Sequence, residues 1–438
     1  MVVSADRFSP NPEASAFEPQ YLVALDELYH AGWAARKKRR ILLVQDAIRH
    51  FWPSGHPTRL IHITGTNGKG SVARYIAAGL RFTGHTGTWT SPHVFDYAER
   101  LHMNGEPAAH ADIADIYHGI LEPYQRERIR HRPEDALTFA EQGILLALHL
   151  FARRTVGWAV IEVGNGGRYT PQMALDVTAS LLTNIAEDHA KTLGAHAWQR
   201  ALEKAGVARK NKPFFTTAVE PNLSYVVKTA RSEGADVFVV NEEDTAAVQQ
   251  VLTRREPDFK LRNLALACRT IQHFFPGLDL ATLTGNMTQH LTARFEEVAP
   301  NIIADVAHNA DKIAKLAEQL RVRYPGETFH FLVGLTRCRD PRAVFAPILP
   351  LAERLVVTNA SYAGQSPHEI AKQLSRETTN VTVIEEPAQA LAHERENLPE
   401  GRRLVLTGSA YMIDQALNQN PYLKVLNATF GRRNKTDV

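Results

Sequence analysis

The chain alternates short apolar runs with segments of helical spacing, a pattern that predicts an α/β fold. β-branched or continuous apolar runs predict buried strands at 60–64, 86–90, 156–163 and 180–185. Apolar residues at helical spacing predict helices over 21–30, 41–51, 72–79, 137–152 and 196–206. Glu141, near the start of the fourth of these helices, could equally lie on a solvent edge.

The strand-then-helix order resumes in the last third of the chain. Strands are predicted to begin at 302 and to follow at 329–333, 354–358, 381–384 and 404–406. This recurrent order predicts two mostly parallel sheets, one in each part of the chain. We place the boundary near residue 292, which gives an amino-terminal domain of residues 1–292 and a carboxyl-terminal domain of residues 293–438. Residues 1–18 are polar and contain proline, so we expect a loose end.

The segment LIHITGTNGKGSVARYIAA, Leu60 to Ala78, predicts a strand, a glycine-rich turn and a helix. The glycines of the turn permit positive φ and leave backbone N–H groups free to converge on an anion. The helix would point its positive end at the same anion, Lys69 would add a full charge, and Ser71 could hold a magnesium ion. The loop departs from the strict Walker pattern, and a tight turn with a solvated lysine is the alternative. Phosphate binding is the better interpretation.

Three further residues are candidates for the same site. Glu162 ends a predicted strand, where a phosphate-loop enzyme places a metal-binding carboxylate. The alternative is a strand-end acid that faces water. His189 follows the next strand and could equally be a structural histidine, because magnesium prefers oxygen ligands. Lys204, taken alone, would be interpreted as a surface lysine.

Composition and charge narrow the class of protein. The 438 residues are 44% hydrophobic and 22% charged, and the net charge of +3 offers no electrostatic case for nucleic acid or an anionic membrane. Cys268 and Cys338 form no disulfide framework and no metal motif, which suits a reducing compartment. No run approaches 18 apolar residues, and the first residues lack the apolar core of a signal peptide. We therefore expect a cytoplasmic protein.

Nine motifs together resemble the folylpolyglutamate synthase and dihydrofolate synthase family of the Mur-ligase superfamily. In the amino-terminal domain they are TGTNGKGS (64–71), TSPH (90–93), ERLHMNGEP (99–107), EVGNGGR (162–168), DH (188–189) and EKAGV (203–207). In the carboxyl-terminal domain they are ARFE (293–296), DVAHN (305–309) and TGSAY (407–411). Their order and spacing match that family over roughly residues 20–415.

The resemblance implies a fold and a reaction. The fold would be a P-loop ATPase domain with a mostly parallel sheet, followed by a smaller Rossmann-like α/β domain. The reaction would be ATP-dependent amide ligation. An acceptor carboxylate attacks the γ-phosphate to give an acyl phosphate, and the amine of an amino acid, usually glutamate, then displaces phosphate. The partners would be these small molecules, and the family suggests a monomer.

The resemblance also implies roles for individual residues. The ATP ligands would be Gly65, Thr66, Asn67, Gly68, Lys69, Gly70, Ser71, Asn263, Arg294, Asp305 and His308. Two Mg²⁺ ions would be held by Ser71, Ser91, Glu162 and His189, and the catalytic residues would be Lys69, Lys204, Arg294 and His308. Lys204 matches a lysine that is carbamylated in the superfamily, which requires a lowered pKa of its amine. Arg294, Asp305 and His308 would close over ATP.

Departures from the family pattern concern the acceptor more than the phosphates. Thr170 and Met173 stand where the family has Asp and Asn, and Thr170 cannot pair as an anion with a pterin. The family's HQxxN appears as FKLRN, which keeps only Asn263, and 37–44 lacks the usual upstream pattern. A non-folate carboxylic acid is therefore the alternative acceptor. A kinase or GTPase-like switch, suggested by NKTD at 434–437, and a catalytically silent scaffold are the remaining alternatives.

Overall fold

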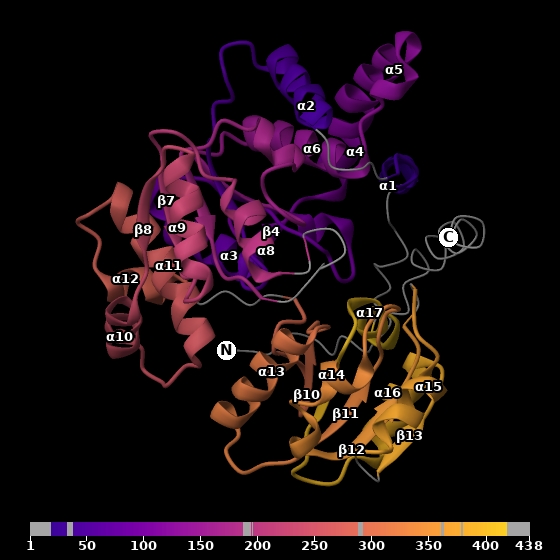
Figure 1. The fold of residues 1–438 in the computed structure, drawn as a ribbon. Coiled ribbons are helices and arrows are strands. Elements are labelled where there is room, and N and C mark those ends of the chain that lie inside the picture. The colour runs from indigo at the N-terminus through magenta and orange to yellow at the C-terminus, as the bar shows by residue number, and fades with distance from the viewer. Residues whose placement is uncertain are drawn as a thin grey trace. The chain divides into compact units, whose positions relative to one another are not determined.

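The structure is a computed structural model that describes residues 19–32, 38–186, 194, 196–287, 292–360, 363–377 and 380–417. These residues fall into two compact units, a larger one within 17–289 and a smaller one from 290 onward (Figure 1). Each unit is described by itself. The predictions for residues 1–18, His189 and 434–437 lie outside the described residues.

The larger unit is built on a mostly parallel sheet of eight strands, as predicted. Its strands are β1 (Arg59–Thr64), β2 (Thr86–Trp89), β3 (Leu101–Met103), β4 (Glu106–Pro107), β5 (Trp158–Glu162), β6 (Ala179–Leu182), β7 (Pro213–Thr216) and β8 (Asp236–Val239). The order across the sheet is β4-β3-β2-β5-β1-β6-β7-β8, and only β3 and β4 run antiparallel to their neighbours. The carboxyl ends of β2, β5, β1 and β6 therefore lie side by side.

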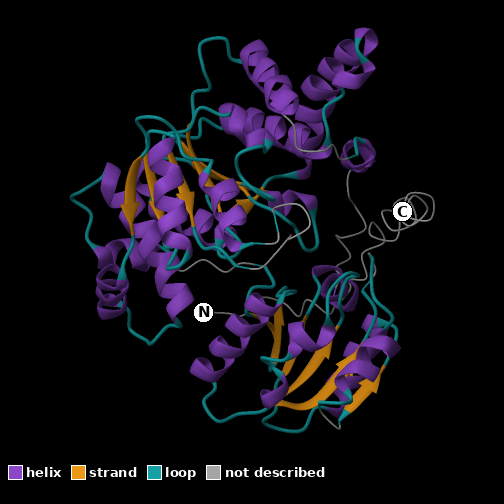
Figure 2. Cartoon of the chain, in the orientation of Figure 1, coloured by secondary structure: helices purple, strands orange, loops and turns teal. Residues whose placement is uncertain are grey.

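Helices cover the strands of both sheets (Figure 2). The larger unit has α1 (Pro19–His30), α2 (Lys38–Phe51), α3 (Lys69–Gly79), α4 (His110–Ile116), α5 (Glu122–His131), α6 (Phe139–Arg153), α8 (Ala197–Ala205), α9 (Asn222–Ser232), α10 (Glu242–Val251), α11 (Asp258–Phe274) and α12 (Leu280–Asn286). Short 3₁₀ helices cover Arg81–Thr83, Tyr97–Arg100, Pro133–Asp135, Pro171–Ala174 and Leu349–Leu351, and a π-helical turn covers Tyr117–Leu121. One core packs α3 and α11 against the sheet, and α8 and α9 cover a second core on β6 and β7.

Glu141 does not lie on a solvent edge. Its side chain is 1% exposed in the first turn of α6, where it accepts from the backbone N–H of Thr138. Arg40 of α2 donates from Nε to Glu141 Oε1 at 2.8 Å. A buried carboxylate needs a counter-charge, and this one comes from a residue about 100 positions earlier in the chain. The helix itself was predicted from its pattern, but the partner was not.

The smaller unit is a six-stranded sheet with the order β13-β12-β11-β14-β10-β9. Its strands are β9 (Glu296–Ala299), β10 (Ile302–Asp305), β11 (Phe329–Val333), β12 (Ala352–Val357), β13 (Val381–Val383) and β14 (Leu404–Thr407). Its helices are α13 (Ala310–Arg323), α14 (Pro341–Phe345), α15 (Pro367–Leu374), α16 (Pro387–Asn397) and α17 (Ala410–Leu417). The parallel strands agree with the prediction, and the antiparallel edge strand β9 was not predicted.

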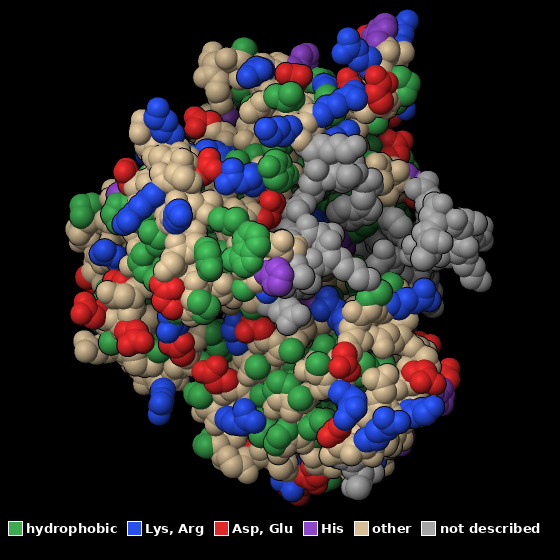
Figure 3. Space-filling view, viewed as in Figure 1, with side chains coloured by type: hydrophobic (Ala, Val, Ile, Leu, Met, Phe, Trp, Pro, Cys, Tyr) green, Lys and Arg blue, Asp and Glu red, His purple; other side chains and the backbone are tan. Residues whose placement is uncertain are grey.

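The mixed charge of the surface and the free state of the cysteines agree with what the composition predicted. Acidic and basic side chains are interspersed over the face shown in Figure 3. Cys268 is buried and Cys338 is exposed, and both are free. Among the described residues, the helices are too short or too polar to cross a membrane.

Several histidines of the larger unit are buried in a neutral form. His62, in the central strand β1, is fully buried, and neither ring nitrogen has a hydrogen-bond partner among the described residues. Burial lowers the pKa of His62 well below its usual value, and the charge of Arg209 lowers it further. Burial and the charge of Arg74 lower the pKa of His102 to about 3. Protonating either ring would place a charge inside the fold.

We expect the larger unit to lose stability below about pH 6.5. The unfolded chain binds protons at these histidines before the folded one does, so their contribution is constant above that pH and falls by about 1.4 kcal/mol per histidine and pH unit below it. All five tryptophans lie between residues 33 and 198, so tryptophan fluorescence during urea unfolding reports on this unit. His62→Leu should reduce the pH slope, whereas His131→Gln, at a ring that is 71% exposed, should not. Equal slopes in His62→Leu and the wild type would contradict the assignment.

Candidate active site

The turn between β1 and α3 has a backbone that requires glycine at two positions. Gly65 has φ of +140° and Gly68 has φ of +82°, and L side chains rarely adopt either. A Cβ added to Gly65 would lie 1.9 Å from Thr183 Oγ1. α3 begins at Lys69, and the first four amides of any helix lack an intrahelical partner. The turn therefore presents N–H groups and a positive helix end to an anion.

The residues that follow β6 hold this turn in place. Thr183 Oγ1 donates to the carbonyl of Asn67 at 2.6 Å. The backbone N–H of Asn67 donates to Asn184 Oδ1 at 2.8 Å, and that of Thr66 donates to the Asn184 carbonyl at 2.9 Å. Sequence reasoning missed Thr183 and Asn184. The only available signal was their position directly after a strand that could pair with β1.

Lys69 and Glu162 lie side by side at the start of α3. Lys69 Nζ is 3.6 Å from Glu162 Oε1, and Glu162 Oε2 accepts from the backbone N–H of Ser91 at 2.9 Å. A Cβ on Gly70 would lie 3.4 Å from Glu162 Oε2, so the carboxylate reaches the first turn of α3. Glu162 is 4% exposed, so the alternative of a strand-end acid facing water is wrong.

The oxygen donors at this edge fit a magnesium ion. Glu162 supplies a carboxylate. Ser91 donates its backbone N–H to that carboxylate, and Ser71 directly follows Gly70, whose added Cβ would lie 3.4 Å from it, so both serine hydroxyls are candidate donors. Mg²⁺ is usually bound by one or two carboxylates together with waters and substrate phosphates, so one carboxylate suffices. Among the described residues no group of three or more His, Cys, Asp or Glu side chains forms a metal cage. His189 lies outside the described residues.

Lys204 is buried, so its interpretation as a surface lysine is wrong. It is 4% exposed near the end of α8, and its Nζ donates to the carbonyl of Gly65 at 2.9 Å. The loop after β5 packs on the same end of α8, where a Cβ on Gly167 would lie 2.6 Å from the Glu203 carbonyl. Arg168 N–H donates to that carbonyl at 3.0 Å. Lys204 is thus joined directly to the phosphate loop.

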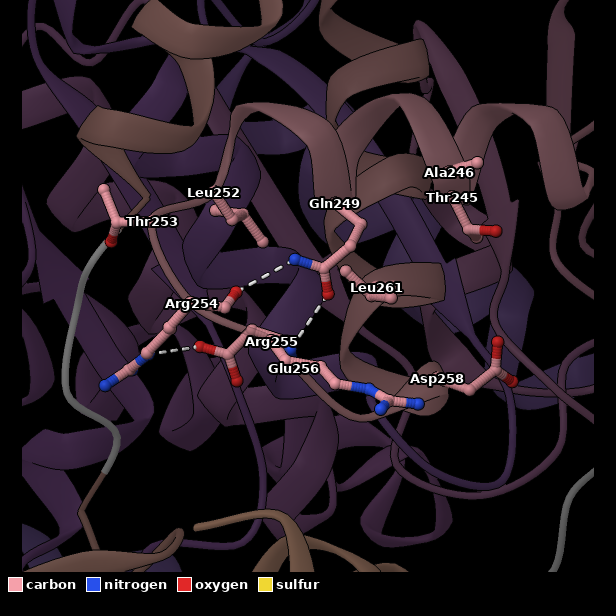
Figure 4. Close-up of a pocket in the computed structure, with 10 residues that line it drawn as sticks. All are labelled: Thr245, Ala246, Gln249, Leu252, Thr253, Arg254, Arg255, Glu256, Asp258 and Leu261. Carbon is pink, nitrogen blue, oxygen red and sulfur yellow. Dashed lines mark hydrogen bonds and ion pairs between the residues drawn. The ribbon is translucent and has the colours of Figure 1, made fainter.

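Asn263 of α11 lies on the opposite side of the turn. A Cβ on Gly68 would be 2.5 Å from Asn263 Oδ1, so the amide touches the phosphate loop. One turn before Asn263, the start of α11 and the end of α10 line a pocket of about 590 Å³ (Figure 4). Its wall is ordered by Gln249, which bridges the Arg254 carbonyl and the Glu256 N–H at 2.9 Å each. The pocket has both polar and apolar lining, and α11 leads from it to Asn263.

Thr170 and Met173, which depart from the family pattern, both make contacts within the larger unit, Thr170 in its own loop and Met173 with the loop after α8. Thr170 is 3% exposed, and its hydroxyl donates to the Gly167 carbonyl at 2.8 Å. Met173 Sδ accepts from Arg209 Nη1 at 3.0 Å. The Thr170 hydroxyl therefore stabilises a turn.

The predicted residues of the smaller unit also lie together. Asp305 accepts from the N–H groups of Phe295 and Ala307 at 2.8 Å each, which ties the segment of Arg294 to the end of β10. Burial raises the pKa of Asp305, and Arg294 opposes that shift. Burial lowers the pKa of His308 well below its usual value, and the charge of Lys312 adds to that shift.

The predicted site residues lie in two groups, one in each unit. Those of the larger unit converge on the turn after β1, namely Gly65 to Ser71, Ser91, Glu162, Lys204 and Asn263. Arg294, Asp305 and His308 form the second group, within the smaller unit. Sequence reasoning missed Lys312, although its i+4 spacing from His308 on a helix was a usable signal.

Comparison with known proteins finds relatives of one kind. Residues 293–410 match the family "Mur ligase, glutamate ligase domain". The chain is 26% identical to folylpolyglutamate synthase of Lacticaseibacillus casei over 407 residues, covering 85% of this chain and 92% of that protein. It is 28% identical to a probable bifunctional folylpolyglutamate synthase/dihydropteroate synthase of Haloferax volcanii, of which it spans 47%. Over most of its length the chain is similar to folylpolyglutamate synthases and dihydrofolate synthases, and its carboxyl-terminal part matches a Mur ligase domain.

Solved structures of the family share the fold. Mycobacterium tuberculosis folylpolyglutamate synthase, complexed with ADP, aligns with a TM-score of 0.80 at 23% identity and covers 92% of this chain and 98% of its own. The bifunctional synthase of Yersinia pestis, complexed with AMPPNP and a Mn ion, aligns with a TM-score of 0.75 at 23% identity and covers 94% and 98%. The predicted α/β fold with two mostly parallel sheets is confirmed.

We expect Gly65→Ala to weaken ADP binding about 5- to 150-fold. The turn would have to give up its positive φ and its contact with Thr183, at a cost of about 1–3 kcal/mol. Isothermal titration of ADP with Mg²⁺ measures the change. Gly277→Ala is the matched control, since a Cβ there meets no atom within 4 Å. Unchanged affinity in Gly65→Ala would show that the turn does not bind the phosphates.

Proposed function

We propose that this chain is an ATP-dependent ligase that joins L-glutamate to a folate-type carboxylate through an acyl phosphate. The observation that carries the proposal is the contact of Lys69 with Glu162 at the amino end of α3, beside a glycine turn shaped for phosphate. The relatives named folylpolyglutamate synthase support the acceptor and the amino acid. The non-folate acceptor gains no such support.

The first step activates the acceptor. A carboxylate is a poor electrophile, so its oxygen attacks the γ-phosphorus while the bond to the ADP oxygen breaks. The amides of the turn hold the phosphates, and Lys69 Nζ stabilises the negative charge on the transferred group. Glu162, Ser71 and Ser91 would hold Mg²⁺, which supplies charge neutralisation when bound.

The second step forms the amide. The free amine of glutamate attacks the acyl carbon, the C–O bond to phosphate breaks, and the nitrogen loses a proton. Lys204, buried against the Gly65 carbonyl, is proposed to be carbamylated, which would turn a cation into an anion next to the phosphates. Arg294, Asp305, His308 and Asn263 are proposed as the further ATP ligands.

The proposal also covers the oligomeric state, the domain boundary and the location of the protein. We propose a monomer with a domain boundary near residue 292, located in the cytoplasm. The two free cysteines are compatible with a reducing compartment.

The proposal predicts phosphate release from ATP that depends on both glutamate and a pterin acid. Dihydropteroate, a reduced folate and a mixture of unrelated carboxylic acids should be compared, with the product identified by mass. We expect one added glutamyl unit with a pterin substrate. Lys69→Ala should lower turnover about a hundredfold to a thousandfold, because it removes transition-state charge stabilisation. Release with the unrelated acids alone would move the enzyme to another acceptor, and release without any amine would favour a kinase.

Lys204→Ala should impair turnover while ADP binding persists, because the turn keeps its amides and Lys69. Added short carboxylic acids should partly restore the rate if a carbamate is the active form. Omitting bicarbonate and carbon dioxide from the wild type is the complementary test. Full activity of Lys204→Ala would remove the carbamate from the mechanism.

A further inference from the structure

Three loops of the smaller unit bring cations to one edge of its sheet. β11, β14 and β10 are adjacent and parallel, so their carboxyl ends lie together. Asp305 ends β10, and Arg339 lies in the loop that follows β11. Arg294 is tied to Asp305 through the N–H of Phe295. Ligands of open α/β sheets bind at this edge.

His308 holds Lys312 at the same edge. Asn309 caps α13 by accepting from the N–H of Lys312 at 2.9 Å, and Lys312 Nζ lies 3.1 Å from His308 Nε2. His308 Nδ1 is 2.8 Å from the Val306 carbonyl. Because a carbonyl only accepts, Nδ1 carries the proton and Nε2 accepts from Lys312. His308 is therefore a neutral positioning residue, and the charge belongs to Lys312.

The edge has an excess of positive charge. Lys312, Arg339 and Arg294 all act electrostatically on His308, and Arg294 and Lys312 also act on the carboxylate of Asp305. Both oxygens of Asp305 already accept backbone N–H groups. Within the described ranges neither Arg294 nor Arg339 has a carboxylate within ion-pair distance. The amino end of α13 adds to the positive potential.

The backbone around both arginines adopts a conformation that non-glycine residues avoid. Ala293 and Phe295, on either side of Arg294, have φ of 47° and 52°, and Cys338, next to Arg339, has φ of 65°. Such residues cost free energy and cluster at functional sites. These strained residues flank two arginines that have no ion-pair partner in the described part of the chain, which indicates that the guanidinium groups are placed for a ligand.

We propose that Lys312, positioned by His308, binds an oxyanion of a reactant together with Arg294 and Arg339. This inference rests on the proposed function and adds Lys312 and Arg339 to its site. The oxyanion is either the terminal phosphate of ATP or a carboxylate of the amino acid, since both present paired oxygens to cations.

Steady-state kinetics of Lys312→Met in the full chain distinguish the two sources. Methionine keeps most of the length of the side chain and removes its charge. We expect the KM for one reactant to rise about 10- to 100-fold, the usual effect of losing a hydrogen bond to a charged group, with the other KM unchanged. A rise for glutamate assigns the carboxylate, and a rise for ATP assigns the phosphate. Lys312→Arg should retain most of the affinity.

Matched variants separate this role from a structural one. Lys315→Met removes a lysine from the next turn of α13, which pairs with Asp311 at 2.7 Å, and should leave both KM values unchanged. His308→Leu should reproduce the effect of Lys312→Met, and His308→Gln, which can still accept from Lys312, should lessen it. Unchanged KM values in Lys312→Met would overturn the inference.

Failure of the proposed function gives a different result. A wild-type protein without glutamate-dependent phosphate release would refute the ligase reaction before any variant is compared. Calorimetry of inorganic phosphate and of glutamate with saturating ADP then decides the inference on its own. Weaker binding of either probe to Lys312→Met supports it, and equal binding to the wild type and the variant overturns it.

Discussion

The conformation of the turn from Gly65 to Gly68 is the constraint on which the active edge depends. Its two positive φ values bring N–H groups together. Thr183 and Asn184 hold this conformation by fixing its carbonyls and amides at the end of β6, and Lys204 of α8 adds one hydrogen bond to the Gly65 carbonyl. Every one of these supports comes from the neighbouring strand or from a helix packed on it. The parallel strand order therefore builds the turn, and the turn then sets where α3 begins and where Lys69 points.

The two charged side chains at this edge of the sheet compensate each other. Lys69 and Glu162 have side chains only 12% and 5% exposed, so each would be costly without the other. A phosphate that takes Lys69 leaves Glu162 without a counter-charge unless a divalent cation arrives with it. Nucleotide and metal therefore fit this edge as a pair better than either does alone. The Ser91 N–H keeps the carboxylate in position in both cases.

The sequence predicted periodic elements well and long-range partners poorly. β11 and the start of β10 were predicted to the residue, because continuous apolar runs between turns define their own ends. β9 was missed, since Glu296 and Glu297 open it and a four-residue edge strand has too little alternation to read. The burial of Glu141 and of Lys204 could not be predicted from the sequence. Each of these side chains pairs with a residue about 100 or more positions away. Motif matching singled out the glycine turn, but the hydrogen bonds of Thr183 and Asn184 belong to no local pattern.

The smaller unit shows why a motif does not fix the chemistry of its residues. The motif DVAHN points to His308 as a catalytic group, and a histidine at such a position could carry charge. Here its two nitrogens are committed, one as a donor to a carbonyl and one as an acceptor from Lys312, so the ring stays neutral. The cation that a phosphate or carboxylate would meet is one turn further along α13, outside the motif. Protonation state and charge placement follow from hydrogen bonds across the helix start, which is information that residue identity alone does not contain.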